Sequence, residues 1–123
     1  MRIFFAISWM IVLAFAMLTP GTKFPEIDLF DFQDKAVHII SFLIQGYLWS
    51  GVGIDENEVS SKNPKIWRNF ILFGVLVGIG FEYLQQFIPY RSFELMDMIA
   101  NALGAGLGLL GYLKWPFIKY ILD

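Results

Sequence analysis

The sequence predicts an all-α membrane protein in which four transmembrane helices form a bundle with both termini on the cytoplasmic side. The first reason is composition, since 57% of the 123 residues are hydrophobic and only 16% are charged. A soluble domain normally has about a quarter of its residues charged, and one of this size cannot bury so much apolar surface. The other two reasons are the lengths of the apolar stretches and the distribution of lysine and arginine.

The apolar residues gather in four stretches, which run over residues 3–19, 36–54, 69–88 and 96–115. A helix needs about 17 to 25 such residues to cross the hydrocarbon core of a bilayer, so each stretch predicts one transmembrane helix. Residues 20–35 contain two prolines and a glycine that interrupt a helix, together with apolar side chains that favour a loop on the membrane surface. Residues 1–123 are therefore interpreted as a single membrane domain.

The basic residues predict the orientation, because positively charged segments near the ends of spans are retained in the cytoplasm. With the amino terminus inside, Arg2, Lys62, Lys65, Arg68, Lys114 and Lys119 are cytoplasmic, whereas Lys23, Lys35 and Arg91 are external. Because more basic residues lie on the cytoplasmic side in this orientation, both termini are expected to be cytoplasmic. A competing interpretation of the first span is a cleaved signal peptide, since Ala14-Phe15-Ala16 fits the small-x-small pattern. The single Arg2 before the apolar run favours a retained anchor instead.

Charge and cysteine content exclude several classes of function. The net charge of -2 provides no positive surface for nucleic-acid binding. The chain has no cysteine, which excludes disulfides, zinc–thiolate sites and thiol catalysis. The sequence also contains neither a phosphate-binding loop nor a dinucleotide-binding glycine motif.

Polar and small residues form one stripe along each of the last three predicted helices. A polar group inside an apolar span is costly unless it is paired or hydrated, so its regular placement is informative. The stripes, with steps of three or four residues, are Asp34, His38, Ser41 and Gln45; Gly74, Gly78, Glu82 and Gln85; and Asp97, Asn101, Gly104 and Gly108. Their polar ends share the external side, which predicts one outward-facing polar pocket. The four glycines are expected to pack helices closely.

The residues of this pocket are assigned two kinds of role. Glu82, His38 and Asp97 are the candidate acid–base residues, because a carboxylate within a span must be neutral, paired or hydrated and because histidine titrates near neutral pH. The candidates for binding or orienting a ligand are Asp34, Lys35, Gln85, Arg91 and Asn101. Arg91, helped by Lys35, would hold an anionic headgroup or carboxylate through charge-assisted hydrogen bonds. A purely structural role for Asp97 is to favour the start of the last helix.

The segment EYLQQFIPYRSFELMDMIANALGAGLG, from Glu82 to Gly108, resembles the VanZ-like family of small bacterial membrane proteins. The family pattern of E-x-x-Q, R and D-x-x-x-N-x-x-G-x-x-x-G is matched by Glu82, Gln85, Arg91, Asp97, Asn101, Gly104 and Gly108, and an Asp-Lys-x-x-His element by Asp34, Lys35 and His38. The resemblance implies a multi-pass protein of the bacterial cytoplasmic (inner) membrane. It also implies a link to glycopeptide resistance, since the family is named after an accessory protein associated with reduced teicoplanin susceptibility.

The favoured function is that the pocket binds or chemically alters an envelope component, either a membrane lipid or a lipid-linked wall precursor. Whether the protein is an enzyme is left open. No cofactor and no metal are predicted, although a divalent cation bound by Asp34, His38, Glu82 and Asp97 is a less favoured version. The alternatives are a small dimeric transporter, which the absence of an ionisable residue in the first span disfavours, and a structural partner of another membrane protein. A homo-oligomer is also left open.

Overall fold

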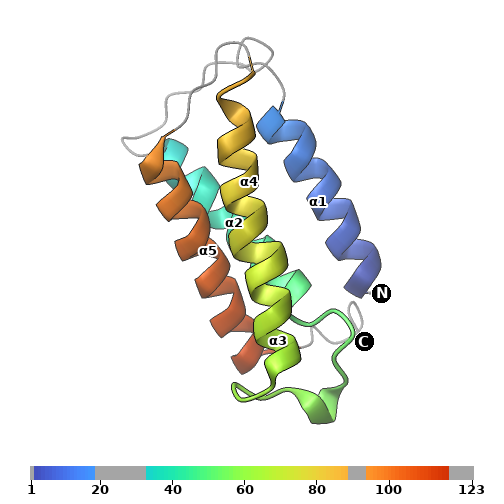
Figure 1. The fold of residues 1–123 in the computed structure, drawn as a ribbon. Helices are drawn as coiled ribbons and strands as arrows, with labels where there is room; N and C mark the ends of the chain where they lie inside the picture. Colours follow the sequence, from blue (N-terminus) through green and yellow to red (C-terminus); the bar gives the residue numbers. More distant parts are fainter. Residues whose placement is uncertain (1, 19–32, 89–93, 117–123) are drawn as a thin grey trace.

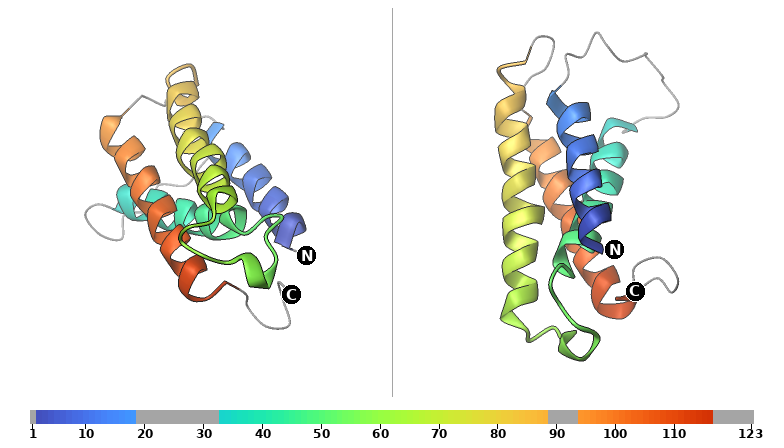
Figure 2. Two further views of the ribbon diagram at one scale, coloured as in Figure 1. Left: turned by 60° about the horizontal axis from the view of Figure 1, so that its bottom comes forward. Right: turned by 90° about the vertical axis from the view of Figure 1, so that its right-hand side faces the viewer.

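The computed structural model describes residues 2–18, 33–88 and 94–116, with side chains in the second range described from Lys35 onward, and this part of the chain is helical without strands. The long helices are α1 (Arg2–Leu18), α2 (Gln33–Ser50), the continuous helix Pro64–Gln85 and α5 (Leu95–Lys114). Figures 1 and 2 show these helices side by side in a bundle. The predicted all-α class is therefore confirmed for the described residues.

The helix Pro64–Gln85 is built from three consecutive segments: α3 (Pro64–Asn69), the π-helical turn η3 (Phe70–Val75) and α4 (Leu76–Gln85). It begins five residues before the predicted span 69–88, because Asn63 caps it. The Asn63 side chain accepts the Lys65 backbone N–H at 2.9 Å, and proline is favoured at the first helical position. The short 3₁₀ helix η2 (Glu56–Glu58) lies in the preceding connection.

The other helix ends lie near the predicted ones. Both α1 and α5 begin and end within one residue of the predicted spans 3–19 and 96–115. In contrast, α2 starts three residues before the predicted span 36–54 and ends four residues before its end. The chain turns there, and Gly53 takes a φ of 75°, which glycine adopts without strain. The predicted surface loop, residues 20–35, lies mostly outside the described residues.

Within the described ranges, two helices are long and apolar enough to cross a membrane: Pro64–Gln85 and Leu95–Lys114. The helix α1 is apolar and has 17 residues, and α2 has 18 residues with several polar side chains. Hydrophobic side chains are exposed along the outer faces of the bundle, among them Phe4, Ile11 and Phe15 on α1 and Leu103 and Leu110 on α5.

The helices α2 and α5 make the most extensive contact of the bundle. Glycines on α5 explain why their backbones come so close. A Cβ atom added at Gly104 would collide with the carbonyl oxygen of Ile39, and one added at Gly108 would collide with the carbonyl oxygen of Leu43. Only a residue without a side chain fits at these two positions, so the register of α2 against α5 is tightly defined.

Glycines on the third long helix face α5 in a looser contact. A Cβ atom added at Gly74 would lie 3.1 Å from Cβ of Ala105, and one added at Gly78 would lie 3.0 Å from Cβ of Asn101. These contacts involve side chains rather than backbone. The stripes that contain these glycines thus lie between helices, as small residues do in closely packed membrane helices.

The first helix contacts the rest of the bundle at three depths. Near its start, Arg2 donates to backbone carbonyl groups at the end of α2. In the middle, Trp9 Nε1 donates to the carbonyl oxygen of Ser41 at 2.9 Å. At its other end, the carbonyl oxygen of Met17 accepts a hydrogen bond of 3.0 Å from Gln85 Nε2. The helix α1 is therefore an integral part of this fold.

Candidate functional site

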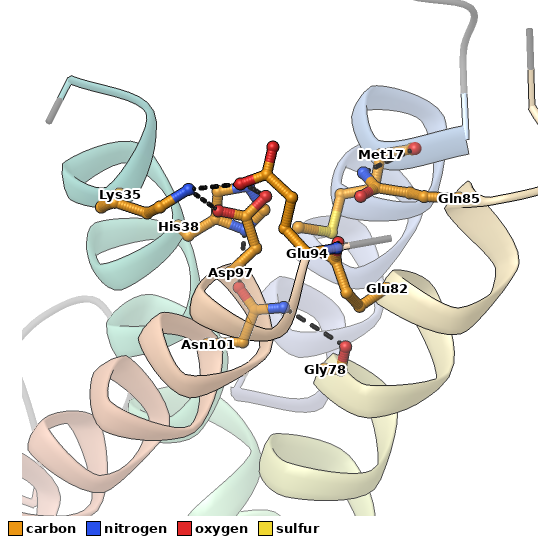
Figure 3. Close-up of polar contacts among 9 residues, drawn as sticks. All are labelled: Met17, Lys35, His38, Gly78, Glu82, Gln85, Glu94, Asp97 and Asn101. Atoms are coloured by element: carbon orange, nitrogen blue, oxygen red, sulfur yellow. Dashed lines mark hydrogen bonds and ion pairs between the residues drawn. The ribbon is translucent and has the colours of Figure 1, made fainter. Parts of the chain in front are cut away.

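Polar side chains from three helices meet at the end of the bundle where α4 ends and α5 begins (Figure 3). His38 on α2, Glu82 on α4 and Asp97 on α5 each offer a ligand atom, and these atoms all lie within 4.8 Å of one another. The three residues are buried, with exposed fractions of 6%, 0% and 5%. Together with Lys35, Glu94 and Asn101, they are called the polar cluster below.

Helix periodicity brings these side chains together. Lys35 and His38 are three residues apart on α2, and Asp97 and Asn101 are four residues apart on α5, so each pair shares one helix face. The close α2–α5 contact presses the two faces together. Glu82 reaches them from α4, one helical turn before that helix ends. The predicted convergence of the three stripes thus occurs among these side chains.

The outer edge of the polar cluster is a charged network centred on Lys35. Lys35 Nζ lies 2.8 Å from Oε2 of Glu94 and forms a second, shorter ion pair with Oδ1 of Asp97. The side chain of Glu94 is 50% exposed and that of Lys35 is 26% exposed, whereas that of Asp97 is 8% exposed. Lys35 and Glu94 therefore lie at the rim, and Asp97 connects them to the buried interior of the cluster.

The orientation of His38 follows from two hydrogen bonds of Asn101. Asn101 Nδ2 lies 3.2 Å from the carbonyl oxygen of Gly78, which can only accept, so this end of the amide must be its NH₂ group. The amide oxygen then faces His38 Nδ1 at 2.7 Å. His38 Nδ1 must carry a hydrogen and donate it. In the neutral ring, Nε2 is consequently the nitrogen with the lone pair, and it lies 3.6 Å from Oδ2 of Asp97.

Glu82 is the most deeply buried acid of the polar cluster. Its Oε1 accepts the backbone N–H of Glu94 at 2.9 Å, in the connection that leads into α5. Its Oε2 is buried and has no hydrogen-bond partner among the described residues. A buried carboxylate oxygen is costly to leave in this condition, so Glu82 is suited to receive a proton, a polar ligand or a cation.

The structure gathers most of the candidates predicted from sequence, with some exceptions. His38, Glu82, Asp97, Asn101 and Lys35 all belong to the polar cluster, whereas the Gln85 side chain turns to α1 and donates to Met17. Arg91 and the side chain of Asp34 lie outside the described part of the structure, so their predicted roles stay predictions.

Sequence reasoning missed Glu94 entirely. This residue contributes a carboxylate to Lys35 and a backbone N–H to Glu82. The available signal was its position three residues before Asp97, at the predicted start of the last helix, where both acids can face Lys35. The arrangement as a whole can move a proton between His38 and a carboxylate, or hold a cation among nitrogen and oxygen ligands.

The fold and the site define a class: a small all-helical protein with helices of membrane-spanning character and a buried polar cluster at one end. Residues 2–119 match the VanZ/LLP1 family, so this chain belongs to the VanZ-like family. A 50-residue segment is 48% identical to the uncharacterized protein C11E3.10 of Schizosaccharomyces pombe, covering 41% of this chain and 31% of that protein. The match thus spans about a third of the relative's length. No solved structure matches this chain.

Proposed function

We propose that the chain is a multi-pass membrane protein whose polar cluster binds a membrane lipid or lipid-linked envelope component and transfers a proton during its conversion. The observation that carries this proposal is the burial of His38, Glu82 and Asp97 at one point of a bundle whose exposed faces are largely apolar. Ionisable groups are expensive inside a membrane bundle, and they commonly mark sites of function there.

The topology proposed is that of four spans with both termini in the cytoplasm. At about 1.5 Å per residue, helices of 17 to 22 residues have lengths of roughly 26 to 33 Å, close to the thickness of the hydrocarbon core. The basic residues Arg2, Lys65, Arg68 and Lys114 lie near the helix ends opposite the polar cluster. By the positive-inside rule that end faces the cytoplasm, and the polar cluster faces outward.

An amphipathic ligand fits the surroundings of the polar cluster. The rim offers the charged pair Lys35 and Glu94, which can exchange partners with a polar headgroup. Apolar side chains close to the rim are exposed, with fractions of 67% for Phe87, 61% for Leu95 and 60% for Met96. A molecule with a polar headgroup and an apolar tail would contact both kinds of surface, as a lipid does.

In this proposal Glu82 and His38 exchange a proton with the bound headgroup. Asn101 fixes the histidine ring so that Nε2 faces the centre of the cluster, and the Lys35 ion pair holds Asp97 beside it. Such positioning is what general acid–base catalysis requires. Asn101 and Lys35 would then act as positioning residues.

The similarity to a fungal protein bears on the choice of ligand. A match in Schizosaccharomyces pombe favours a component that bacterial and fungal membranes share, such as a glycerophospholipid, over a precursor confined to the bacterial wall. A link to teicoplanin and other glycopeptides, which the family name implies, would then follow from an altered envelope. A location in the bacterial cytoplasmic membrane is part of the same proposal.

The experiment is a profile of lipids and muropeptides in cells that lack the protein, complemented with wild type, Glu82→Gln or Glu56→Gln at equal membrane abundance. Glu56 is an exposed acid near the opposite end of the bundle, so its variant is the matched control. We expect one lipid species to change on deletion and to be restored by wild type and by Glu56→Gln only. Restoration by Glu82→Gln would refute the proton-transfer role.

A further inference from the structure

The polar cluster has the composition of a metal site. It presents one imidazole and two carboxylates from three different helices, with ligand atoms within 4.8 Å of one another. We propose that His38, Glu82 and Asp97 bind one divalent first-row transition metal ion, such as Mn²⁺ or Zn²⁺. This inference rests on the proposed function for the ion's role: with the ion bound, His38 and Glu82 would be ligands, and a water on the ion would take their place in exchanging a proton with the headgroup. Binding itself is measurable without any lipid.

The first argument is the orientation of His38. A histidine that binds a metal commonly donates its second N–H to an oxygen acceptor, which fixes the ring and makes the ligating nitrogen more basic. Here Nδ1 donates to Asn101 Oδ1 at 2.7 Å, and Asn101 is itself held by the carbonyl oxygen of Gly78. The nitrogen on the side of Asp97 is therefore Nε2, which carries the lone pair when the ring is neutral.

The second argument is the spacing of the ligand atoms. Bonds of about 2.0 to 2.2 Å hold neighbouring ligand atoms of a four- or five-coordinate ion roughly 3.0 to 3.6 Å apart. His38 Nε2 and Asp97 Oδ2 are already 3.6 Å apart. Because Lys35 pairs with Oδ1 of Asp97, it is Oδ2 that is directed toward the histidine. The most distant ligand atoms need to approach by about 1 Å, which carboxylate rotation can provide.

The third argument is Glu82 itself, which is independent of the spacing. Its exposed fraction is 0%, and its Oε2 has no hydrogen-bond partner within the described part of the chain. Its other oxygen is occupied by the backbone N–H of Glu94. An ion coordinated by Glu82 would satisfy this buried oxygen without moving the helix that carries it.

The fourth argument is charge. Glu82 and Asp97 place two buried carboxylates within 4.8 Å of the His38 ring nitrogen. Burying carboxylates is costly, and coordination of a metal ion is one of the ways in which proteins stabilise them.

The ligand set also indicates which ions fit. An imidazole nitrogen with carboxylate oxygens suits manganese, iron or zinc, whereas Mg²⁺ and Ca²⁺ prefer oxygen ligands alone. Three protein ligands leave coordination positions for water or for an oxygen of the ligand, as in catalytic metal sites. A phosphate-bearing headgroup would be a suitable partner, because the bound ion would offset the negative charge of the cluster.

The test uses the full chain without an affinity tag, purified in detergent and stripped with a chelator. Mn²⁺, Zn²⁺ and, as a control, Mg²⁺ are titrated, and bound metal is counted after dialysis by elemental analysis. We expect one equivalent of Mn²⁺ or Zn²⁺ per chain and at least a hundredfold weaker binding of Mg²⁺. Wild-type protein that retains neither Mn²⁺ nor Zn²⁺ would overturn the proposal, whatever the variants do.

Binding measurements on single-residue variants then show which side chains coordinate the ion. His38→Gln, Glu82→Gln and Asp97→Asn should each weaken binding at least tenfold, whereas Glu56→Gln, at the exposed opposite end of the bundle, should change it less than threefold. Electron spin echo measurements on bound Mn²⁺ should show coupling to an imidazole nitrogen that disappears in folded His38→Gln protein. Unchanged binding in all three ligand variants, or a missing nitrogen signal in wild type, would overturn the assignment.

The two proposals fail separately. If no metal binds but Glu82→Gln still abolishes complementation, the acid–base proposal stands and the metal site falls. If one equivalent of metal binds but deletion leaves every lipid and muropeptide unchanged, the metal site stands and the proposed function falls.

Discussion

The carboxylate of Glu82 accepts the backbone N–H of Glu94 at 2.9 Å, so the last turn of α4 is bonded to the residue that precedes α5. The two residues are 12 positions apart in the sequence. This hydrogen bond means that the acid assigned to chemistry also holds the start of the helix that carries Asp97 and Asn101. Glu82 therefore has a structural role, the hydrogen bond to Glu94, as well as its proposed chemical role. Substitutions at this position must be chosen so that the two effects can be told apart.

Glu82→Gln and Glu82→Leu are expected to distinguish the structural role of Glu82 from its chemical role. The glutamine keeps an oxygen that can accept the Glu94 N–H, so its free energy of unfolding should stay within about 1 kcal/mol of wild type. The leucine leaves that N–H without an acceptor, which typically costs about 1 to 3 kcal/mol. Thermal unfolding in detergent micelles would measure both, with Glu56→Leu as the exposed control. Equal losses for glutamine and leucine would show that the hydrogen bond contributes nothing.

Asn101→Ala tests the orientation of His38. In wild type, nitrogen-15 NMR of selectively labelled histidine should show Nδ1 protonated and Nε2 bearing the lone pair, because Nδ1 donates to Asn101. Without the amide oxygen, the preference between the two tautomers should be lost. Ser41→Ala, on the same helix as His38, is the control and should leave the histidine spectrum unchanged. A wild-type ring protonated mainly at Nε2 would contradict the arrangement described above.

Much of this site was predictable because helical periodicity is visible in the sequence. Steps of three and four residues place His38, Asp97, Asn101 and Glu82 on particular helix faces. A polar residue in an apolar stretch must find partners, so the stripes had to meet. The helix ends next to Pro64 and Gly53 were harder, because a cap or a turn is decided by a few local hydrogen bonds rather than by a repeated pattern.

Other features depend on three-dimensional contacts that no pattern encodes. The role of Glu94 arises because α4 and α5 place its backbone against Glu82. The π-helical turn Phe70–Val75 is another case: the carbonyl oxygen of Phe73 accepts a hydrogen bond of 3.0 Å from Gln45 Nε2 on a different helix. Each contact joins two separate helices, so the pattern along a single helix does not show it, and sequence reasoning missed both.

The glycine contacts between α2 and α5 give a prediction with a matched control on one helix. Gly104→Ala and Gly108→Ala would push a methyl group into the backbone of α2, so each should destabilise the fold by about 1 to 3 kcal/mol. A Cβ atom at Gly106 meets nothing within 4 Å, so Gly106→Ala should be neutral or stabilise by up to about 1 kcal/mol. Thermal unfolding of the three variants would check this. Similar values for all three would mean that α2 and α5 are not in backbone contact.

Arg2 gives a prediction for the opposite end of the bundle. Its guanidinium lies 5.1 Å from the ring centre of Tyr47 and 4.9 Å from that of Tyr112, and it donates to carbonyl oxygens of Tyr47, Leu48 and Pro116. A lysine keeps the charge but cannot donate in several directions from one plane. Arg2→Lys should therefore lower the unfolding free energy by about 1 to 3 kcal/mol.

Lys62→Ala serves as the control for Arg2→Lys, because Lys62 is exposed in the connection between α2 and α3. Its effect should stay within about 0.5 kcal/mol, as for most surface substitutions. Thermal unfolding of both variants in the same detergent would compare them. An Arg2→Lys protein as stable as wild type would show that charge alone, without the directed hydrogen bonds, suffices at this position.

The topology gives the last prediction, and the absence of native cysteine makes the measurement clean. Ser60→Cys lies in the exposed connection before α3, and Gln86→Cys lies in the exposed turn after α4, near the polar cluster. If the polar cluster faces outward, a membrane-impermeant maleimide should label Gln86→Cys in intact cells. Ser60→Cys should react only after the membrane is opened, because the positive-inside rule keeps the neighbouring Lys62 and Lys65 in the cytoplasm. Labelling with the opposite sidedness would invert the orientation and place the polar cluster on the cytoplasmic side, where its ligand would have to be a lipid of the inner leaflet.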